Sequence, residues 1–223
     1  MFSKELGAKL DKYHLLKHPF YQKYWNEGRL TREIIKDYAE QYYQHVKAFP
    51  RYISATHSIC EDLEKRKILL ENLQDEENKD GDHPKLWKNF AKAMGADEKE
   101  IEKVKLDWFT KDMIDNFFFQ ARKSYAEGLA SLYTYERQIP EIAETKIQGL
   151  KKFYGVNSKE GLEFFEAHKS ADVIHRAECE KLLDGLSKEE QVKAEKASVL
   201  TARYLWNFLS GMTSKHKLES VAA

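Results

Sequence analysis

The segment SKEGLEFFEAHKSADVIHRAECEKLLDGL, residues 158–186, is the most informative about the fold. Its apolar residues recur with the period of an α-helix, and Ser158 is a suitable N-cap. His168, Asp172 and His175 share its apolar stripe at positions i, i+4 and i+7, so their side chains project together. Two imidazoles and a carboxylate suit a redox-capable divalent metal. The alternative is that the three side chains hydrogen-bond to one another or face solvent.

The rest of the chain has the same helical period, without a β pattern, an internal repeat or a Gly/Ser linker. The expected helices are 3–16, a short one from Pro19 through Trp25, one that Thr31 caps and Pro50 kinks or restarts, 52–78, 84–95, a short one after Asp97, 111–139, one ending near Gly155, 158–186, and a last one that Ser187 caps. These patterns predict an all-α, single-domain bundle of seven to nine helices over residues 1–212, followed by a frayed tail over 213–223.

The composition excludes several classes of protein. Lysine plus arginine and aspartate plus glutamate both number 37, so there is no basic excess of the kind that nucleic acid requires. The two cysteines, Cys60 and Cys179, fit a reducing cytosol better than a disulfide framework. No stretch is apolar enough for a signal core or a membrane span. We therefore expect a cytoplasmic protein with no nucleic-acid or membrane partner.

Two further carboxylates fall where a core is expected. Glu136 ends an apolar stripe of the expected helix 111–139, and a buried glutamate is costly unless it is paired, protonated or bound to a metal. In LLENLQDEENKDGDHPKLW, residues 69–87, Glu76 and Glu77 fit the apolar period almost equally well. His83 stands at a loop-to-helix junction, from which it can reach either glutamate. Periodicity leaves the choice between the two glutamates open.

Lys146 lies on an apolar helix face with Ile142 and Leu150. Burial disfavours an ammonium group, which makes a neutral, nucleophilic amine accessible. The alternative is a side chain whose stem is packed and whose amine reaches water. Together, three helices would direct three histidines and three carboxylates inward, enough for two divalent ions. The paired Glu-x-x-His motifs of ferritin-like dimetal proteins are absent from the sequence.

Four stretches carry a resemblance to a known family: DYAEQYYQHVKAFPRYISATHS (37–58), LLENLQDEEN (69–78), LYTYERQIPEIAETKIQGL (132–150) and FFEAHKSADVIHRAE (164–178). The chain resembles self-sacrificing para-aminobenzoate synthases, a group that includes the chlamydial protein associating with death domains. The likeness runs from about residue 15 to about residue 183. The wider family contains the pyrroloquinoline-quinone synthesis protein C and the thiaminase-II group, and it implies a haem-oxygenase-like fold.

The resemblance implies a site and an activity. The family's six metal ligands fall on Glu76, His83, Glu136, His168, Asp172 and His175. They would hold two divalent ions, iron with iron or iron with manganese, and dioxygen and an external reductant would be co-substrates. Tyr21 matches the tyrosine that provides the ring of para-aminobenzoate for folate synthesis, and Lys146 matches the lysine that provides the nitrogen. Tyr135 matches a family tyrosine close to the metals, which implies a role in passing electrons or a radical, and Tyr38 is a weaker candidate for the same role. The alternative for both is core packing with a hydrogen-bonded hydroxyl.

Other readings of the same residues remain. The six ligands would serve an oxygenase of this fold that acts on an external small molecule. A thiaminase-II-like hydrolase requires a core cysteine, which the Glu136 helix lacks. Haem degradation, with His14 or His18 as axial ligand, would leave the carboxylates unused. A homodimer, or a protein that binds host death domains, is suggested only by the resemblance.

Overall fold

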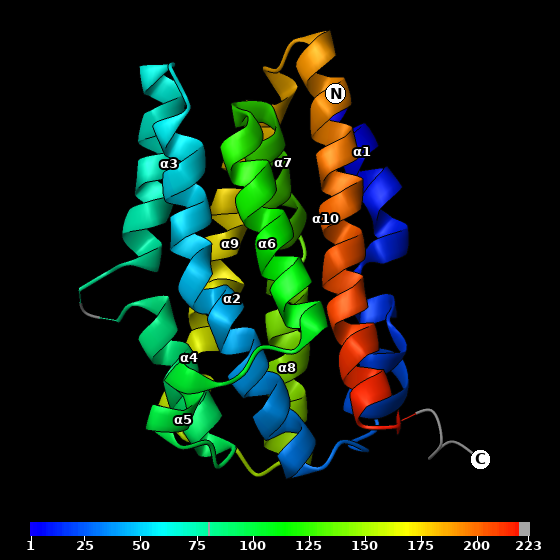
Figure 1. Ribbon diagram of the computed structural model, residues 1–223. Helices are drawn as coiled ribbons and strands as arrows, with labels where there is room; N and C mark the ends of the chain where they lie inside the picture. The colour runs from blue at the N-terminus through cyan, green and yellow to red at the C-terminus, as the bar shows by residue number, and fades with distance from the viewer. Residues whose placement is uncertain (80, 219–223) are drawn as a thin grey trace.

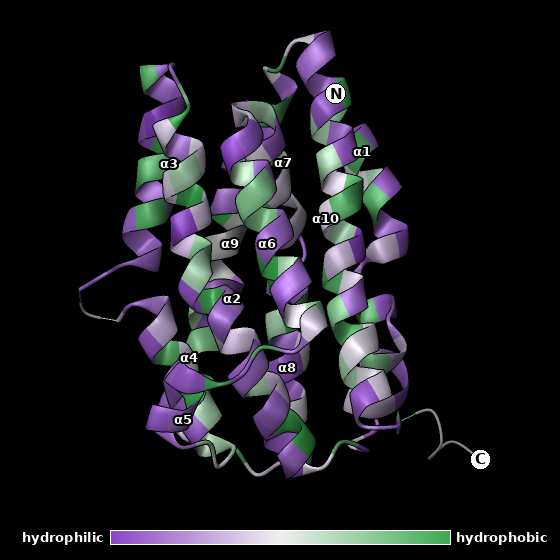
Figure 2. Ribbon diagram, in the orientation of Figure 1, coloured by the Kyte–Doolittle hydropathy of each residue, from purple (hydrophilic) through white to green (hydrophobic). Residues whose placement is uncertain are grey.

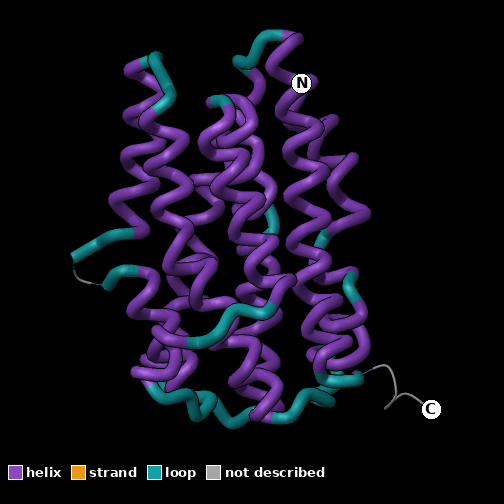
Figure 3. Tube along the Cα trace, viewed as in Figure 1, coloured by secondary structure: helices purple, strands orange, loops and turns teal. Residues whose placement is uncertain are grey.

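The computed structural model describes residues 1–79 and 81–218, apart from the side chains of residues 170–173. The described residues form helices joined by short loops, without a strand (Figure 3). The α-helices are α1 (Phe2–Leu10), α2 (Arg32–Ser58), α3 (Leu63–Glu76), α4 (His83–Ala93), α5 (Glu98–Lys103), α6 (Trp108–Lys123), α7 (Tyr125–Glu136), α8 (Ile139–Phe153), α9 (Lys159–Asp184) and α10 (Lys188–Lys215). The prediction of an all-α fold is confirmed.

The long helices stand side by side, with α3 and α2 at one edge and α10 and α1 at the other (Figure 1). Helix α7 lies in the middle, where it contacts α2, α6, α9 and α10. Every residue from Ala126 to Glu136 is buried, as expected for a helix that other helices enclose on all sides. Helix α9 packs against α4, α7 and α8, which brings its histidines next to the helices that carry the other candidate ligands.

Hydrophilic and hydrophobic residues alternate along most of the visible helices, and α5 is hydrophilic over most of its length (Figure 2). Within the described part of the chain, no helix has both the length and the apolar character needed to cross a bilayer.

Two expected helix boundaries near the N-terminal half were wrong. The first helix ends at Leu10, and two short 3₁₀ turns, Asp11–Tyr13 and Leu15–Lys17, replace its last part. Pro50 lies inside α2, which runs uninterrupted from Arg32 to Ser58 and packs against α3, α4, α6 and α7. The break comes after Ser58 instead, where the carboxylate of Asp62 accepts the N–H groups of Glu64 and Lys65 and starts α3.

The expected helix 111–139 is two helices, α6 and α7. Ser124 between them has extended backbone angles, and its hydroxyl accepts the N–H of Glu127. Glu136 therefore faces the core because α7 is enclosed, and not because it continues a stripe from α6.

The C-terminal end is also more ordered than expected. Helix α10 continues to Lys215, and the backbone oxygen of the buried Leu218 accepts a hydrogen bond from Tyr24. The expectation of a frayed tail from residue 213 was wrong as far as Leu218, and residues 219–223 lie outside the described part. The caps predicted at Thr31, Asp97, Ser158 and Ser187 are confirmed.

Candidate metal centre

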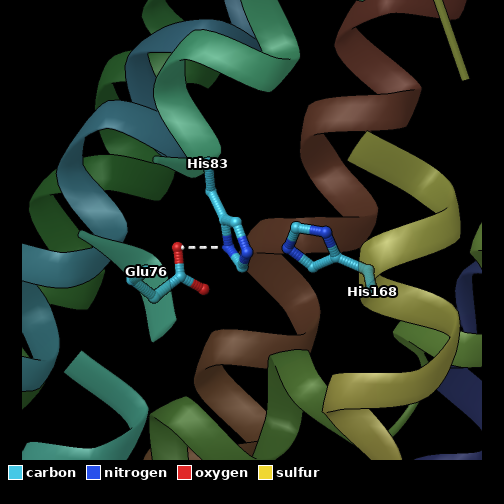
Figure 4. A group of neighbouring side chains, drawn as sticks. All are labelled: Glu76, His83 and His168. Carbon is cyan, nitrogen blue, oxygen red and sulfur yellow. Dashed lines mark ion pairs between the residues drawn. The ribbon is translucent and has the colours of Figure 1, made fainter. Parts of the chain in front are cut away.

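Three buried side chains from three helices form a group that can hold a metal ion. Glu76 is the last residue of α3, His83 is the first of α4, and His168 lies in the middle of α9. Each offers one ligand atom, and these atoms lie within 4.8 Å of one another. The side chains converge from different helices, with Nδ1 of His83 at 2.8 Å from a carboxylate oxygen of Glu76 (Figure 4). Glu76 is buried and Glu77 is exposed, so the fold decides what periodicity left open.

Local structure places these ligand atoms. Asp82 caps α4 by accepting the N–H of Lys85, which puts His83 on the first turn. In α9, Nδ1 of His168 lies 2.7 Å from the backbone oxygen of Phe164. A ring nitrogen that donates to a carbonyl leaves Nε2 as the acceptor, the arrangement commonly found for metal-binding histidines.

The electrostatics also fit a cation. Burial is the main reason why the pKa of His168 lies well below its ordinary value, and the nearby His83 lowers it further. Both effects favour the neutral imidazole, which is the form that binds metals. Two imidazole rings with centroids 4.2 Å apart and one carboxylate form a nitrogen and oxygen donor set that suits iron or manganese. The residues present therefore fit a divalent metal.

The remaining expected ligands lie close to this group but have other contacts. Glu136 is 1% exposed and accepts hydrogen bonds from Asn72 and Cys179. Nε2 of His175 lies 3.0 Å from Oδ2 of Asp75, at the surface end of α3. Asp172 lies in α9, but its side chain is outside the described residues. The group that the structure brings together thus contains three of the six, with Glu136 and His175 buried nearby.

A small cavity lined by buried side chains adjoins the centre. Its volume is about 20 Å³, and it is lined mostly by apolar and aromatic side chains. His168 forms part of its wall, as do Lys146 and the four tyrosines Tyr21, Tyr38, Tyr42 and Tyr135. A volume of this size holds about one water-sized molecule. The cavity therefore places a candidate metal ligand, a lysine and several phenols around one small space.

Lys146 is enclosed by the core. It is 4% exposed, which rules out a stem that carries its amine to water, and Nζ donates a 2.6 Å hydrogen bond to the hydroxyl of Tyr38. Nζ also lies 4.6–5.4 Å from the ring centres of Tyr38, Tyr42, Trp87 and Phe165. Burial lowers the pKa of Lys146 to about 7, so a large share of the amine is neutral at physiological pH.

The tyrosines continue this network. Burial raises the pKa of Tyr21, and a hydrogen bond from Tyr38 partly opposes that rise. Tyr38 thus accepts a hydrogen bond from Lys146 and interacts with the hydroxyl of Tyr21, so it lies between the two residues expected to supply nitrogen and ring. Tyr42 stacks on Tyr38 with centroids 5.4 Å apart, and its hydroxyl interacts with Tyr135. Tyr42 was not among the expected site residues, because nothing in the sequence distinguishes it from an aromatic residue of the core.

The helical bundle that holds this buried histidine–carboxylate group has a haem-oxygenase-like fold, as comparison with known proteins shows. The model of a family described as iron-containing redox enzymes matches residues 36–206, and the chain belongs to this family. A 4-aminobenzoate synthase from Chlamydia muridarum is 42% identical, over 93% of this chain and 88% of the relative. Another from Nitrosomonas europaea is 38% identical, over 95% and 90%. The fold is similar to that of a TenA homologue from Pseudomonas syringae pv. tomato, with a TM-score of 0.82, 16% identity and coverage of 96% and 93%.

Proposed function

We propose that this protein makes para-aminobenzoate from its own side chains, with the ring from Tyr21 and the nitrogen from Lys146. Relatives named 4-aminobenzoate synthase, at about 40% identity over most of the chain, support the product. The observation that carries the internal substrate is the small buried cavity that Tyr21, Lys146 and His168 line together. Each chain would complete at most about one turnover, and the product would enter folate synthesis.

The size of the cavity favours an internal substrate over an external one. An apolar cavity that binds benzene measures about 150 Å³, whereas this cavity measures about 20 Å³. A free aromatic acid or a lipid would have to displace core side chains to reach His168. Dioxygen is small enough to enter, and the ring of Tyr21 is already at the wall.

The metal ligands in this proposal are Glu76, His83, Glu136, His168, Asp172 and His175. Two ions bound there, iron with iron or iron with manganese, would supply the activation of dioxygen with electrons from an external reductant. The chain's own contribution is to hold the reacting groups at contact range and to exclude water by the surrounding aromatic rings.

Tyr38 and Lys146 have defined parts in this arrangement. The hydroxyl of Tyr38 accepts a 2.6 Å hydrogen bond from the amine of Lys146 and interacts with Tyr21. It therefore orients both the residue that would supply the nitrogen and the residue that would supply the ring. The lowered pKa of Lys146 keeps an amine lone pair available for bond formation. Tyr135, next to Glu136 and hydrogen-bonded to Tyr42, is proposed with Tyr38 to carry electrons between the metal centre and Tyr21.

The test is mass spectrometry of the intact chain and its peptides after the reduced, iron- and manganese-loaded protein meets oxygen, with para-aminobenzoate measured in the same sample. We expect mass loss at Tyr21, a change at Lys146 and product at no more than about one per chain. Tyr21→Phe and Lys146→Arg should each abolish product and leave metal content unchanged. Tyr24→Phe and Lys151→Arg are matched controls and should retain product.

An unchanged chain that consumes oxygen would refute the internal substrate. It would identify the protein as an oxygenase of the same fold that acts on an external small molecule.

A further inference from the structure

Helix α3 directs very few side chains into the protein. Only Leu69, Asn72 and Glu76 of this helix are buried, and two of these three are polar. Asn72 precedes Glu76 by one turn, so the two side chains lie on the same face. Asparagine is an unfavourable residue inside a helix, and a buried amide must find hydrogen-bond partners. Its presence at this position therefore needs an explanation beyond helix formation or packing.

The amide of Asn72 is used to hold Glu136. Its Nδ2 donates a 2.6 Å hydrogen bond to Oε1 of Glu136, which lies at the end of α7. The thiol of Cys179 on α9 contacts the other oxygen, with Sγ 3.3 Å from Oε2. All three side chains are at most 3% exposed. The carboxylate is thus oriented by donors from two different helices.

The other end of the Asn72 amide also faces a buried environment. Its Oδ1 has no hydrogen-bond partner among the described residues. This buried acceptor is open to one further hydrogen-bond donor.

We propose that Asn72 is a positioning residue of the metal centre, which sets the orientation of Glu136 relative to Glu76. This inference rests on the proposed function, because it takes both glutamates as metal ligands. Asn72 shares a rigid helical turn with Glu76 and a hydrogen bond with Glu136, so it links ligands that come from α3 and α7. Partners of this kind fix the direction of a ligand's lone pairs.

Removal of the Asn72 side chain should affect one of the two metal ions more than the other. Glu136 is outside the group of three formed by Glu76, His83 and His168. Loss of the Asn72 amide should lower the affinity for the ion that depends on Glu136 by about 10–100-fold, which is the usual effect of removing a partner that orients a metal ligand. The ion held mainly by the group of three should keep its affinity.

The experiment measures Mn²⁺ bound per chain by equilibrium dialysis of the metal-free protein, without oxygen or reductant. Asn72→Leu nearly preserves the side-chain volume and removes the amide that donates to Glu136. We expect the wild type to bind two ions tightly and this variant to bind one tightly and one weakly. Asn116→Leu is the matched control, because Asn116 is also a buried helical asparagine, but it donates to Thr201. This control should lose stability and keep both ions. If Asn72→Leu does not fold, Asn72→Ser must show the same selective loss.

Three outcomes would overturn the inference. Unchanged binding of both ions by the Asn72 variants would show that Glu136 needs no such support, and the proposed function would stand. Equal weakening of both ions would indicate a general loss of packing. A wild-type chain that binds fewer than two ions would refute the proposed dimetal centre and this inference with it.

Discussion

The buried amine of Lys146 should make the stability of the folded protein depend on pH in a defined direction. Burial lowers its pKa from 10.5 to about 7 in the folded state. A change of one in pKa corresponds to about 1.4 kcal/mol. At a pH low enough for the amine to be protonated in both states, the free energy of unfolding is therefore lower by about 5 kcal/mol than at high pH. Above pH 10.5 neither state binds the proton and there is no cost. As the pH falls towards 7, only the unfolded chain gains the proton, and stability decreases.

The perturbation that isolates this effect is Lys146→Met, which keeps the length of the side chain and removes the titrating group. The free energy of unfolding of the metal-free wild type, relative to this variant, should rise by about 2 kcal/mol between pH 7 and pH 9. Urea unfolding at several pH values measures both proteins under the same conditions. Lys151→Met, on the exposed side of the same helix, should show no comparable trend.

Parallel stability curves for wild type and Lys146→Met between pH 7 and pH 9 would refute the reasoning. They would mean that the amine remains charged in the folded protein throughout this range. Lys146 would then have no neutral lone pair for bond formation at physiological pH, and its assignment as nitrogen donor would lose its physical basis.

The other predictions concern the metal, the tyrosine network and the packing. His168→Ala removes a buried donor from the group of three and should reduce bound Mn²⁺ by at least one ion per chain in equilibrium dialysis. Tyr38→Phe leaves the amine of Lys146 without its acceptor, and urea unfolding should show a loss of about 1–3 kcal/mol. Gly128→Ala would place a Cβ 2.4 Å from Oγ1 of Thr56 and should cost about 1–3 kcal/mol. Gly185→Ala meets no atom closer than 3.5 Å and should be nearly neutral in the same assay. Full metal content in His168→Ala, or wild-type stability in Tyr38→Phe or Gly128→Ala, would contradict these contacts.

The sequence by itself determined the fold class and most helix starts. Helical period and N-caps are properties of short segments, so Thr31, Asp97, Ser158 and Ser187 could be read without the rest of the chain. The same local pattern placed His168 and His175 on an inward face, where both are buried. Lys146 stood out for the same reason, as a charged residue on an apolar face.

Only the tertiary structure decided the helix breaks and the meeting of the ligands. Pro50 is tolerated because neighbouring helices pack against α2, and Ser124 ends α6 although the apolar period continues past it. The choice of Glu76 over Glu77 depends on which face of α3 meets the core, and adjacent helix positions differ by about 100°. Asn72 and Glu136 are 64 residues apart, and their hydrogen bond has no local signature. Contacts of this kind depend on how enclosed helices settle against one another, which no single helix specifies.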